Sequence, residues 1–368
     1  MRRSISSPLA ASLLALAGLA ASASEQPPTT ESYSEQVNVS EVLLDVIVTD
    51  SQGNVIVGLT PQDFKITEDG KPVELTGATF YSSRRFLGGE QELAKASGAI
   101  DTVPKSRYFI LFFEEQQRAN ADNPGLGLIQ RQLEAVRESK KWVQHDKQLD
   151  DFVAVVSYDT RLKLHQDFTQ DARAVLAGID SAAKGADPGS NWPSRQAKPG
   201  EISLRAGLPT GRELDKKTTR LYDALSVLAD ASKGIVGRKN VIFFGMGFGD
   251  LNSFGLYQPD PRYYPPMIQS LNSANVAVYT LDIVPNNVEY QLSNSLHQLA
   301  SETGGRFFDN FTSFLTPLQQ IGSENSGYYL LAYRSAHPSS AKGYQRVKIE
   351  SKNPEFQVRS REGYSYGG

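Results

Sequence analysis

An unbroken apolar run from Tyr108 to Phe113 constrains the fold more than any other feature of the sequence. A strand that is apolar at every position is buried on both faces, as strands are in a parallel sheet covered by helices. Three later runs, residues 152–156, 241–244 and 276–283, have a similar character. Segments with apolar residues at helical spacing separate these runs. Strands that alternate with helices across short connections predict a doubly wound, mostly parallel α/β sheet.

Two segments with the period of β-strands bracket this region. In residues 35–85, the alternation of Val42, Leu44, Val46 and Val48 with their neighbours predicts a strand, and Asp69-Gly70 supplies the positive φ angles of a tight hairpin. Strand-like runs return in residues 326–366. Each segment has too few strands to bury both of its faces alone, so we predict that the two pair into one sandwich-like module. The small, polar stretch 86–105 is predicted to be a linker, and residues 106–322 the α/β domain.

The first 23 residues have the three-part build of a secretory signal peptide. Arg2 and Arg3 precede an uncharged run, Leu9 to Leu19, and Ala21-Ser22-Ala23 offers the small residues of a cleavage site. The alternative is a membrane anchor, but this run is shorter than the roughly 20 residues that span a bilayer. We therefore expect cleavage after Ala23, a periplasmic or secreted protein, and no transmembrane segment in the mature chain.

Composition narrows the range of partners. The chain has no cysteine, so its core must be stable without disulfides. Removal of the signal peptide takes away two arginines and no acidic residue, which leaves a formal net charge of −5. Basic residues cluster only in short groups such as Lys216-Lys217, whereas phosphate backbones require larger basic patches. We expect no nucleic-acid partner.

Three sets of motifs lie at the start, the centre and the end of the mature chain. They are Val48-Thr49-Asp50 with Gly53, Leu59, Asp63-Phe64 and Glu68-Asp69-Gly70-Lys71; Thr219-Arg220-Leu221-Tyr222-Asp223-Ala224; and Tyr328-Tyr329-Leu330-Leu331 with Val358-Arg359-Ser360-Arg361-Glu362-Gly363-Tyr364. Together they resemble the von Willebrand factor type A (VWA) related proteins abundant in Acidobacteria. The resemblance implies a VWA domain that acts as a protein-binding or scaffolding module of the cell envelope, without catalysis of its own.

VWA domains bind ligands through a metal-ion-dependent adhesion site, where an Asp-x-Ser-x-Ser loop, a Thr and a second Asp hold Mg²⁺. The resemblance places Glu114, Gln116 and Arg118 at the loop positions, Thr219 at the threonine and Met246 at the second aspartate. A positive charge and a soft sulfur both disfavour Mg²⁺, which prefers hard oxygen ligands. The resemblance therefore implies a degenerate site with weak or absent Mg²⁺ binding, where the only matched metal ligands are Glu114 and Thr219.

A different acidic site is the alternative at this place. Asp250, Glu115 and Asp122 lie near enough in sequence to form a rearranged metal site, which would make the protein a metal-binding VWA adhesin.

The loop 254–266 follows the fourth strand of the domain and should lie at the carboxyl edge of the sheet, where open α/β folds bind ligands. Its aromatic and basic residues suit a protein contact surface; they are Tyr257, Arg262, Tyr263 and Tyr264. A lid packed on its own domain is the equal alternative.

Other chemistries have weaker signals. Gly245-Met246-Gly247-Phe248-Gly249 lacks the spacing of a dinucleotide loop, and its glycines are better explained by backbone crowding. Ser181-Ala182-Ala183-Lys184 lacks the partner motifs of penicillin-recognising enzymes, and the histidines, His165 among them, are interpreted as surface or packing residues. The sequence predicts no catalysis, and an envelope hydrolase with an unrecognised site is the alternative function.

Overall fold

The computed structural model describes residues 41–82, 106–114, 125–186, 202–285, 291–335 and 342–367. All of them belong to one compact unit, Val39–Gly368. The predicted signal peptide and the whole of the predicted linker lie outside the described residues. No helix of the described residues is long and apolar enough to cross a membrane.

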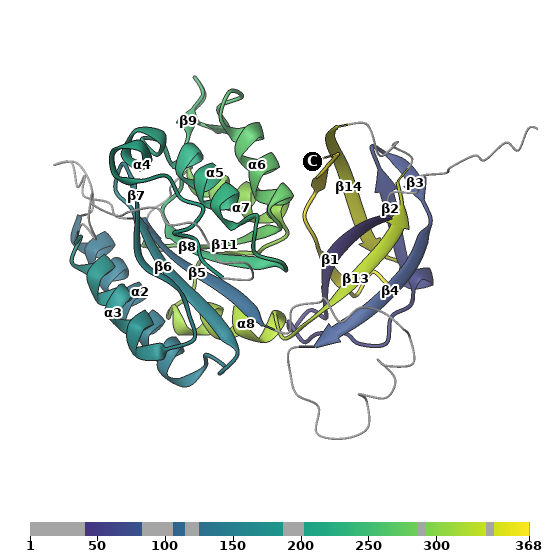
Figure 1. Ribbon diagram of the computed structural model, residues 1–368, viewed down its shortest axis with the longest axis horizontal. Helices are drawn as coiled ribbons and strands as arrows, with labels where there is room; N and C mark the ends of the chain where they lie inside the picture. The colour runs from purple at the N-terminus through teal and green to yellow at the C-terminus, as the bar shows by residue number, and fades with distance from the viewer. Residues whose placement is uncertain are drawn as a thin grey trace, which may run out of the picture. The chain divides into compact units, whose positions relative to one another are not determined.

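A six-stranded sheet forms the centre of the α/β part (Figure 1). Its spatial order is β12-β11-β8-β5-β6-β7, and all neighbours are parallel except β6 and β7. Numbered along the chain within this sheet, the order is 3-2-1-4-5-6 read from β7, which is the order of a doubly wound fold. The prediction of a doubly wound, mostly parallel sheet is confirmed. The strands are β5 (Arg107–Glu114), β6 (Asp151–Tyr158), β7 (Leu162–Thr169), β8 (Lys239–Gly245), β11 (Val276–Asp282) and β12 (Phe307–Phe308).

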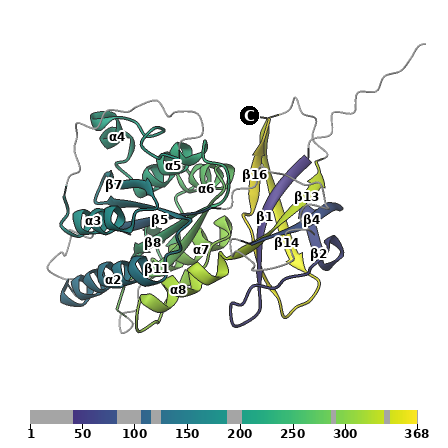
Figure 2. The ribbon, with the colours of Figure 1, turned by 60° about the horizontal axis from the view of Figure 1, so that its bottom comes forward.

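Helices cover both faces of this sheet. Alternate residues of β5 enter two separate cores: Ile110 and Phe112 pack in one, and Phe109 and Leu111 in the other. Figure 2 shows α2 and α8 below the strands and α5 and α6 above them. This double coverage is the reason that β5 is apolar at successive positions. The helices are α2 (Gly125–His145), α3 (Ala172–Ala183) and α8 (Leu315–Glu324) on one face, and α5 (Leu221–Ser232), α6 (Tyr264–Ser273) and α7 (Ser293–Thr303) on the other, with the short α4 (Gly211–Lys217) before α5.

Two four-stranded sheets enclose a third core, built from both ends of the described chain. Val42 pairs with Tyr333 in the first sheet, and Ile66 pairs with Ile349 in the second. The first sheet has the order β15-β1-β13-β4 and the second the order β16-β14-β2-β3. Their bounds are β1 (Glu41–Thr49), β4 (Leu75–Ser82), β13 (Gly327–Arg334) and β15 (Gln357–Arg359), then β2 (Phe64–Glu68), β3 (Lys71–Val73), β14 (Gly343–Ser351) and β16 (Gly363–Tyr366), with a 3₁₀ turn at Pro61–Asp63.

Strand β1 departs from the half-buried pattern that its alternation predicts. Asp45 and Ile47, which should face solvent, are buried. The Asn275 side-chain amide donates a hydrogen bond to the Asp45 carboxylate, and Arg361 donates one to the Leu43 carbonyl at 3.0 Å. Polar groups therefore cover the second face of β1 at Asp45, while Leu43 on the same face stays exposed, and apolar alternation alone does not reveal this.

The predicted loop 254–266 contains regular structure near both of its ends. Helix α6 begins inside it, at Tyr264, because Pro265 and Pro266 fit the first turn of a helix, where no amide hydrogen is needed. Upstream, β9 (Asp250–Leu251) and β10 (Tyr257–Gln258) form a short hairpin.

A buried ion pair joins the starts of β5 and β6. Arg107 donates to both carboxylate oxygens of Asp151, at 2.6 and 2.7 Å, and to the Gly322 carbonyl of α8 at 2.6 Å. Removing Asp151 leaves a buried cation without its partner. We predict that Asp151→Ala lowers the free energy of unfolding by about 3–5 kcal/mol in urea titrations.

The adjacent Asp150 is the control for this prediction. It is exposed, and Asp150→Ala should change the free energy of unfolding by less than about 0.5 kcal/mol. Equal effects of the two substitutions would contradict a structural role for the Arg107–Asp151 pair.

Lys239 gives the protein a pH-dependent stability. Its side chain is 2% exposed and its ammonium donates to the Ile235 carbonyl at 2.8 Å. Burial lowers the pKa of Lys239 from 10.5 to about 8. Between these values the unfolded chain holds the proton and the folded chain does not, so stability rises with pH in that window. We compare the free energy of unfolding of the wild type with that of Lys239→Met. We predict that this difference shifts in favour of the wild type by up to about 3 kcal/mol as the pH rises from about 8 to about 10.

Urea unfolding of both proteins across this range measures the effect. Lys233→Met, at an exposed lysine, is the control and should follow the wild type. A difference in the free energy of unfolding between wild type and Lys239→Met that stays constant with pH would contradict the prediction.

Candidate functional site

The winding of the sheet reverses where β5 and β8 lie side by side. From this point the chain winds toward β7 in one direction and toward β12 in the other. Doubly wound sheets bind ligands at the carboxyl ends of the strands on either side of this reversal. Here those ends are Glu114 on β5 and Gly245 on β8.

Glu114 is held by the backbone of the neighbouring loop. Its Oε2 accepts a hydrogen bond from the Met246 amide at 3.1 Å. A Cβ on Gly245 would lie 2.5 Å from the same oxygen, so only glycine allows this approach. The Met246 side chain is buried in the core that contains α2 and α8. The peptide group of Met246, and not its sulfur, therefore faces Glu114.

Thr219 and Tyr158 lie at the same edge. The Tyr158 hydroxyl donates to the Thr219 carbonyl at 3.0 Å, and Thr219 itself is exposed. Burial, and then the negative charge of Glu114, raise the pKa of Tyr158 to about 12. The preceding Thr218 is buried, and its hydroxyl accepts from the Leu162 amide and donates to the Leu214 carbonyl. Thr218 fixes the loop, and Thr219 is the threonine left accessible.

The remaining positions of the predicted metal site are not tested by the structure. Gln116, Arg118, Glu115 and Asp122 lie outside the described residues. Among the residues that are described, no group of three or more His, Cys, Asp or Glu side chains is arranged to hold a metal ion.

A second carboxylate at this edge, Asp282, has both oxygens engaged. Ser293 donates to one at 2.6 Å and the Val284 amide to the other at 2.8 Å. Burial raises the pKa of Asp282. Because Asp282 pairs with Gly245 in the sheet, carboxylates flank the end of β8 on both sides, but each is bonded within the protein.

The glycines of the loop after β8 allow close packing of the backbone. Gly247, at φ +97°, lies against the Leu292 carbonyl, where a Cβ would come within 2.2 Å. Gly249, at φ +100°, lies against the ring of Tyr257. The Phe248 amide donates to Ser295 at the start of α7 at 2.9 Å. These contacts fit the interpretation of backbone crowding and fix the loop on α7.

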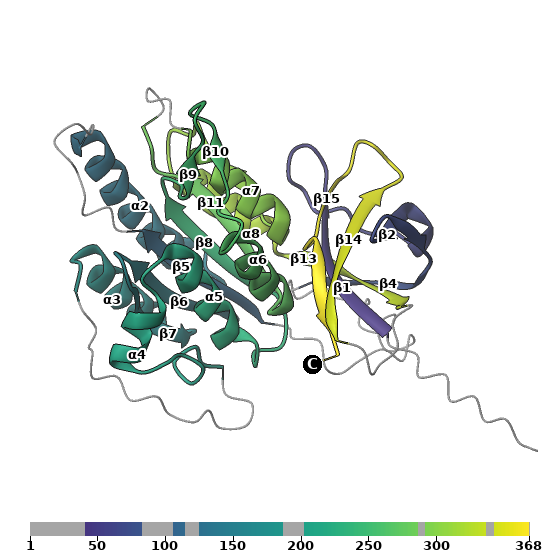
Figure 3. The ribbon, with the colours of Figure 1, turned by 90° about the horizontal axis from the view of Figure 1, so that it is seen from above.

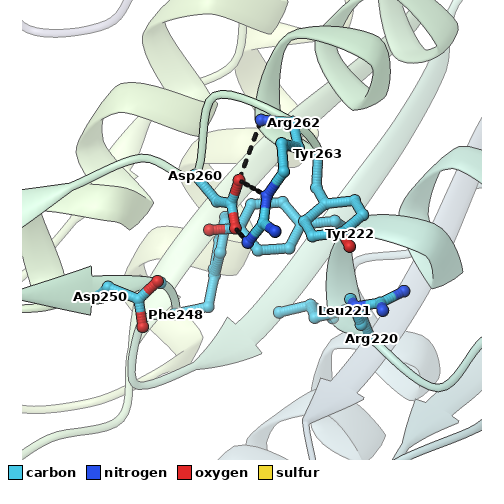
Figure 4. A pocket seen from close by; sticks show the side chains of 9 residues that line it. Arg220, Leu221, Tyr222, Phe248, Asp250, Asp260, Arg262 and Tyr263 are labelled. Atoms are coloured by element: carbon cyan, nitrogen blue, oxygen red, sulfur yellow. Dashed lines mark hydrogen bonds and ion pairs between the residues drawn. The ribbon is translucent and has the colours of Figure 1, made fainter.

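A pocket of about 500 Å³ opens beside this loop, at the N-terminal ends of α5 and α6. We call it the edge pocket. Figure 4 shows Asp250 on one side of it, Arg220 and Leu221 on the other, and the Asp260–Arg262 pair between them. Its lining residues are Arg220, Leu221, Tyr222, Phe248, Gly249, Asp250, Asp260, Arg262 and Tyr263.

Charged and aromatic groups are layered in the edge pocket. Two guanidinium groups lie over the Tyr263 ring, that of Arg220 at 4.4 Å and that of Arg262 at 5.2 Å from the ring centroid. Arg262 donates to both oxygens of Asp260, at 3.1 and 2.8 Å, and Arg220 donates to Asp223 at 3.0 Å. The hydrogen bonds from Arg262 lower the pKa of Asp260, which keeps it ionised.

The structure separates the residues of the predicted contact loop. Arg262 and Tyr263 line the edge pocket. Tyr264 is buried, and the ring of Tyr257 lies beneath Gly249. The loop is thus partly a packed lid, through Tyr257 and Tyr264, and partly an accessible surface, through Arg262 and Tyr263.

A histidine with two serine partners bears on the alternative function, an envelope hydrolase. His165 hydrogen-bonds Ser157 at 2.8 Å and Ser181 at 2.9 Å, and so links β6, β7 and α3. Ser157 is fully buried, so a substrate has no access to it. The histidine is a packing residue, while Ser181 turns toward His165 and not outward as a helix-surface residue would.

Sequence reasoning misses several residues of the edge pocket. Arg220 and Tyr222 stand out in the sequence only as part of a motif, and Phe248 only as part of a glycine loop. A useful signal is present nonetheless: Arg220 precedes α5 just as Arg262 precedes α6, so both fall where helices begin at the carboxyl edge.

Several solved structures share a similar arrangement at low sequence identity. A von Willebrand factor type A protein from Catenulispora acidiphila is 8% identical, with a TM-score of 0.38 over 90% of this chain and 74% of that one. BatB from Bacteroides thetaiotaomicron is 12% identical, with a TM-score of 0.34 over 60% and 98%. The human COPII-coat protein Sec24c is 10% identical, with a TM-score of 0.37 over 71% and 43%, so this chain spans less than half of its length.

No protein-family model matches the sequence, and no curated protein does. The description of the fold therefore rests on the strand order. The resemblance to the VWA-related proteins of Acidobacteria stays a prediction.

Two glycines with positive φ test the crowding at the site. Gly247 has no room for a side chain, whereas Gly255, at φ +75°, has no atom within 4 Å of the position that a Cβ would occupy. We predict that Gly255→Ala costs about 1 kcal/mol, from the backbone conformation alone, and that Gly247→Ala costs more than about 3 kcal/mol. Urea unfolding measures both, and equal costs would contradict the packing of this loop on α7.

Proposed function

We propose that this chain is a non-catalytic, VWA-type protein-binding module that meets its partner at the carboxyl edge of the six-stranded sheet. The observation that carries the proposal is the edge pocket, in which Arg220 and Arg262 both lie over the ring of Tyr263. Tyrosine and arginine are enriched in the energetically dominant parts of protein interfaces. Ion pairs with Asp223 and Asp260 already orient the two arginines, which reduces the entropy that binding has to overcome.

The lining of the edge pocket supports a binding role over catalysis. Its nine residues include no serine, threonine, cysteine, histidine or lysine, so the only groups of nucleophilic type in its lining are carboxylates and tyrosines. A pair of carboxylates can hydrolyse glycosides only when one of them stays protonated as the acid. Asp260 does not fit that role, because Arg262 lowers its pKa.

The proposed binding does not use a metal ion. Glu114 accepts from the Met246 amide, and Met246 contributes its backbone and not a ligand side chain. Mg²⁺ requires an octahedral shell of oxygen atoms, which Glu114 and Thr219 alone leave mostly to water. The proposal includes export to the periplasm or medium, which rests on the signal-like residues 1–23.

Calorimetry tests the metal part of this proposal. We predict no heat of binding beyond dilution when Mg²⁺ or Mn²⁺ is titrated into the mature protein. Micromolar affinity that Glu114→Ala abolishes would instead show a rearranged metal site, as in the adhesin alternative.

Affinity capture tests the contact surface. With the mature chain as bait in envelope extract, we predict a partner whose capture persists in EDTA and falls at least about tenfold with Tyr263→Ala, as expected for an interface hot spot. Tyr366→Ala, at a partly buried tyrosine of β16, is the control. Loss of the captured partner in EDTA, or capture that Tyr263→Ala leaves unchanged, would overturn the proposal.

A further inference from the structure

The tip of the β9–β10 hairpin exposes three large apolar side chains within six residues. Phe254 is 86% exposed, Leu256 55% and Leu251 49%. Figure 3 shows β9 and β10 together as a short hairpin. Single exposed apolar residues are common on protein surfaces, but three in one short hairpin favour an interaction site.

Hydrogen bonds fix the shape of this tip. The Asn252 side-chain oxygen accepts from the amides of Phe254 and Leu256, at 2.9 and 3.0 Å. The Asn252 amide donates to the Leu256 carbonyl at 2.8 Å, and the Gly255 amide to the Asn252 carbonyl at 2.9 Å. At the base, Tyr257 packs against Gly249. The apolar side chains therefore stand on a preorganised turn, which keeps the entropic cost of binding low.

The only charged side chain in residues 250–258 is that of Asp250. Asp250, at the base of the hairpin, is exposed and lines the edge pocket. Within the described residues its carboxylate makes no hydrogen bond or ion pair, whereas Asp260 is paired with Arg262. The hydrogen bond to Asp260 and, to a lesser extent, the nearby charge of Asp250 raise the pKa of the Arg262 guanidinium. An apolar surface thus adjoins one carboxylate that makes no ion pair.

We propose that the hairpin tip is the anchor of the interface: Phe254 inserts into an apolar socket on a partner protein, and a lysine or arginine beside that socket pairs with Asp250. This inference rests on the proposed function and names the chemistry of its partner. A lipid surface fits less well, because anionic headgroups repel Asp250 and the hairpin has no basic residue to attract them.

Photocrosslinking tests the inference with the full mature chain as probe. p-Benzoylphenylalanine replaces Phe254 in one protein and Leu149 in a control, since Leu149 is equally exposed at 90% but lies at the opposite edge of the sheet, before β6. After irradiation in envelope extract, we expect one protein crosslinked from position 254 and none from 149. The crosslinked peptide should be apolar and carry or adjoin a lysine or arginine.

Variants then test the two contacts separately. Phe254→Ser should lower capture of the same protein at least about tenfold, and Asp250→Lys at least about fivefold, while Asp150→Lys leaves it unchanged. Crosslinks to lipid, to a second copy of this chain, or to a surface without a basic residue would overturn the inference.

The failures of the two proposals are distinguishable. If capture depends on Tyr263 but not on Phe254, the proposed function stands and the hairpin anchor is wrong. If no protein is captured through Tyr263, the proposed function itself is wrong.

Discussion

The burial of β5 on both faces is the constraint on which the rest of the structure depends. A strand whose successive side chains are all apolar must be covered by helices on each side, and this requirement produces the two cores that Ile110 and Leu111 enter. Glu114 is the residue at which the strand leaves those cores. The position of the candidate site thus follows from where the apolar run ends.

At that point the polar groups are bonded within the protein. Glu114 accepts from the Met246 amide, and Gly247 holds the same loop against Leu292. The accessible charged and aromatic side chains lie farther along the edge, where Arg220 and Arg262 lie over the Tyr263 ring. The proposed binding role rests on this pocket beside a loop whose polar groups are bonded within the protein.

The sequence predicts most of the fold, because periodicity reports burial. The runs at 108–113 and 276–283 correspond to β5 and β11, and the alternation that begins at Val42 corresponds to β1. It does not predict features decided by three-dimensional packing. The motif pattern places Met246 at a ligand position, but strand geometry turns its side chain into the core. The aromatic loop is one unit in sequence, yet Tyr264 is buried while Tyr263 is not.

The pairing of β1 with β13 has a consequence for biogenesis. Val42 is hydrogen-bonded in register with Tyr333, so 291 residues separate the two partners in synthesis. At typical elongation rates of about 5–20 residues per second, the ribosome needs roughly 15–60 s to supply the missing strand. During that interval an apolar strand with unpaired edges is exposed, which is the state most prone to wrong pairing with other chains. Correct folding of this chain therefore requires that β1 stays unpaired with other strands until β13 has been synthesised.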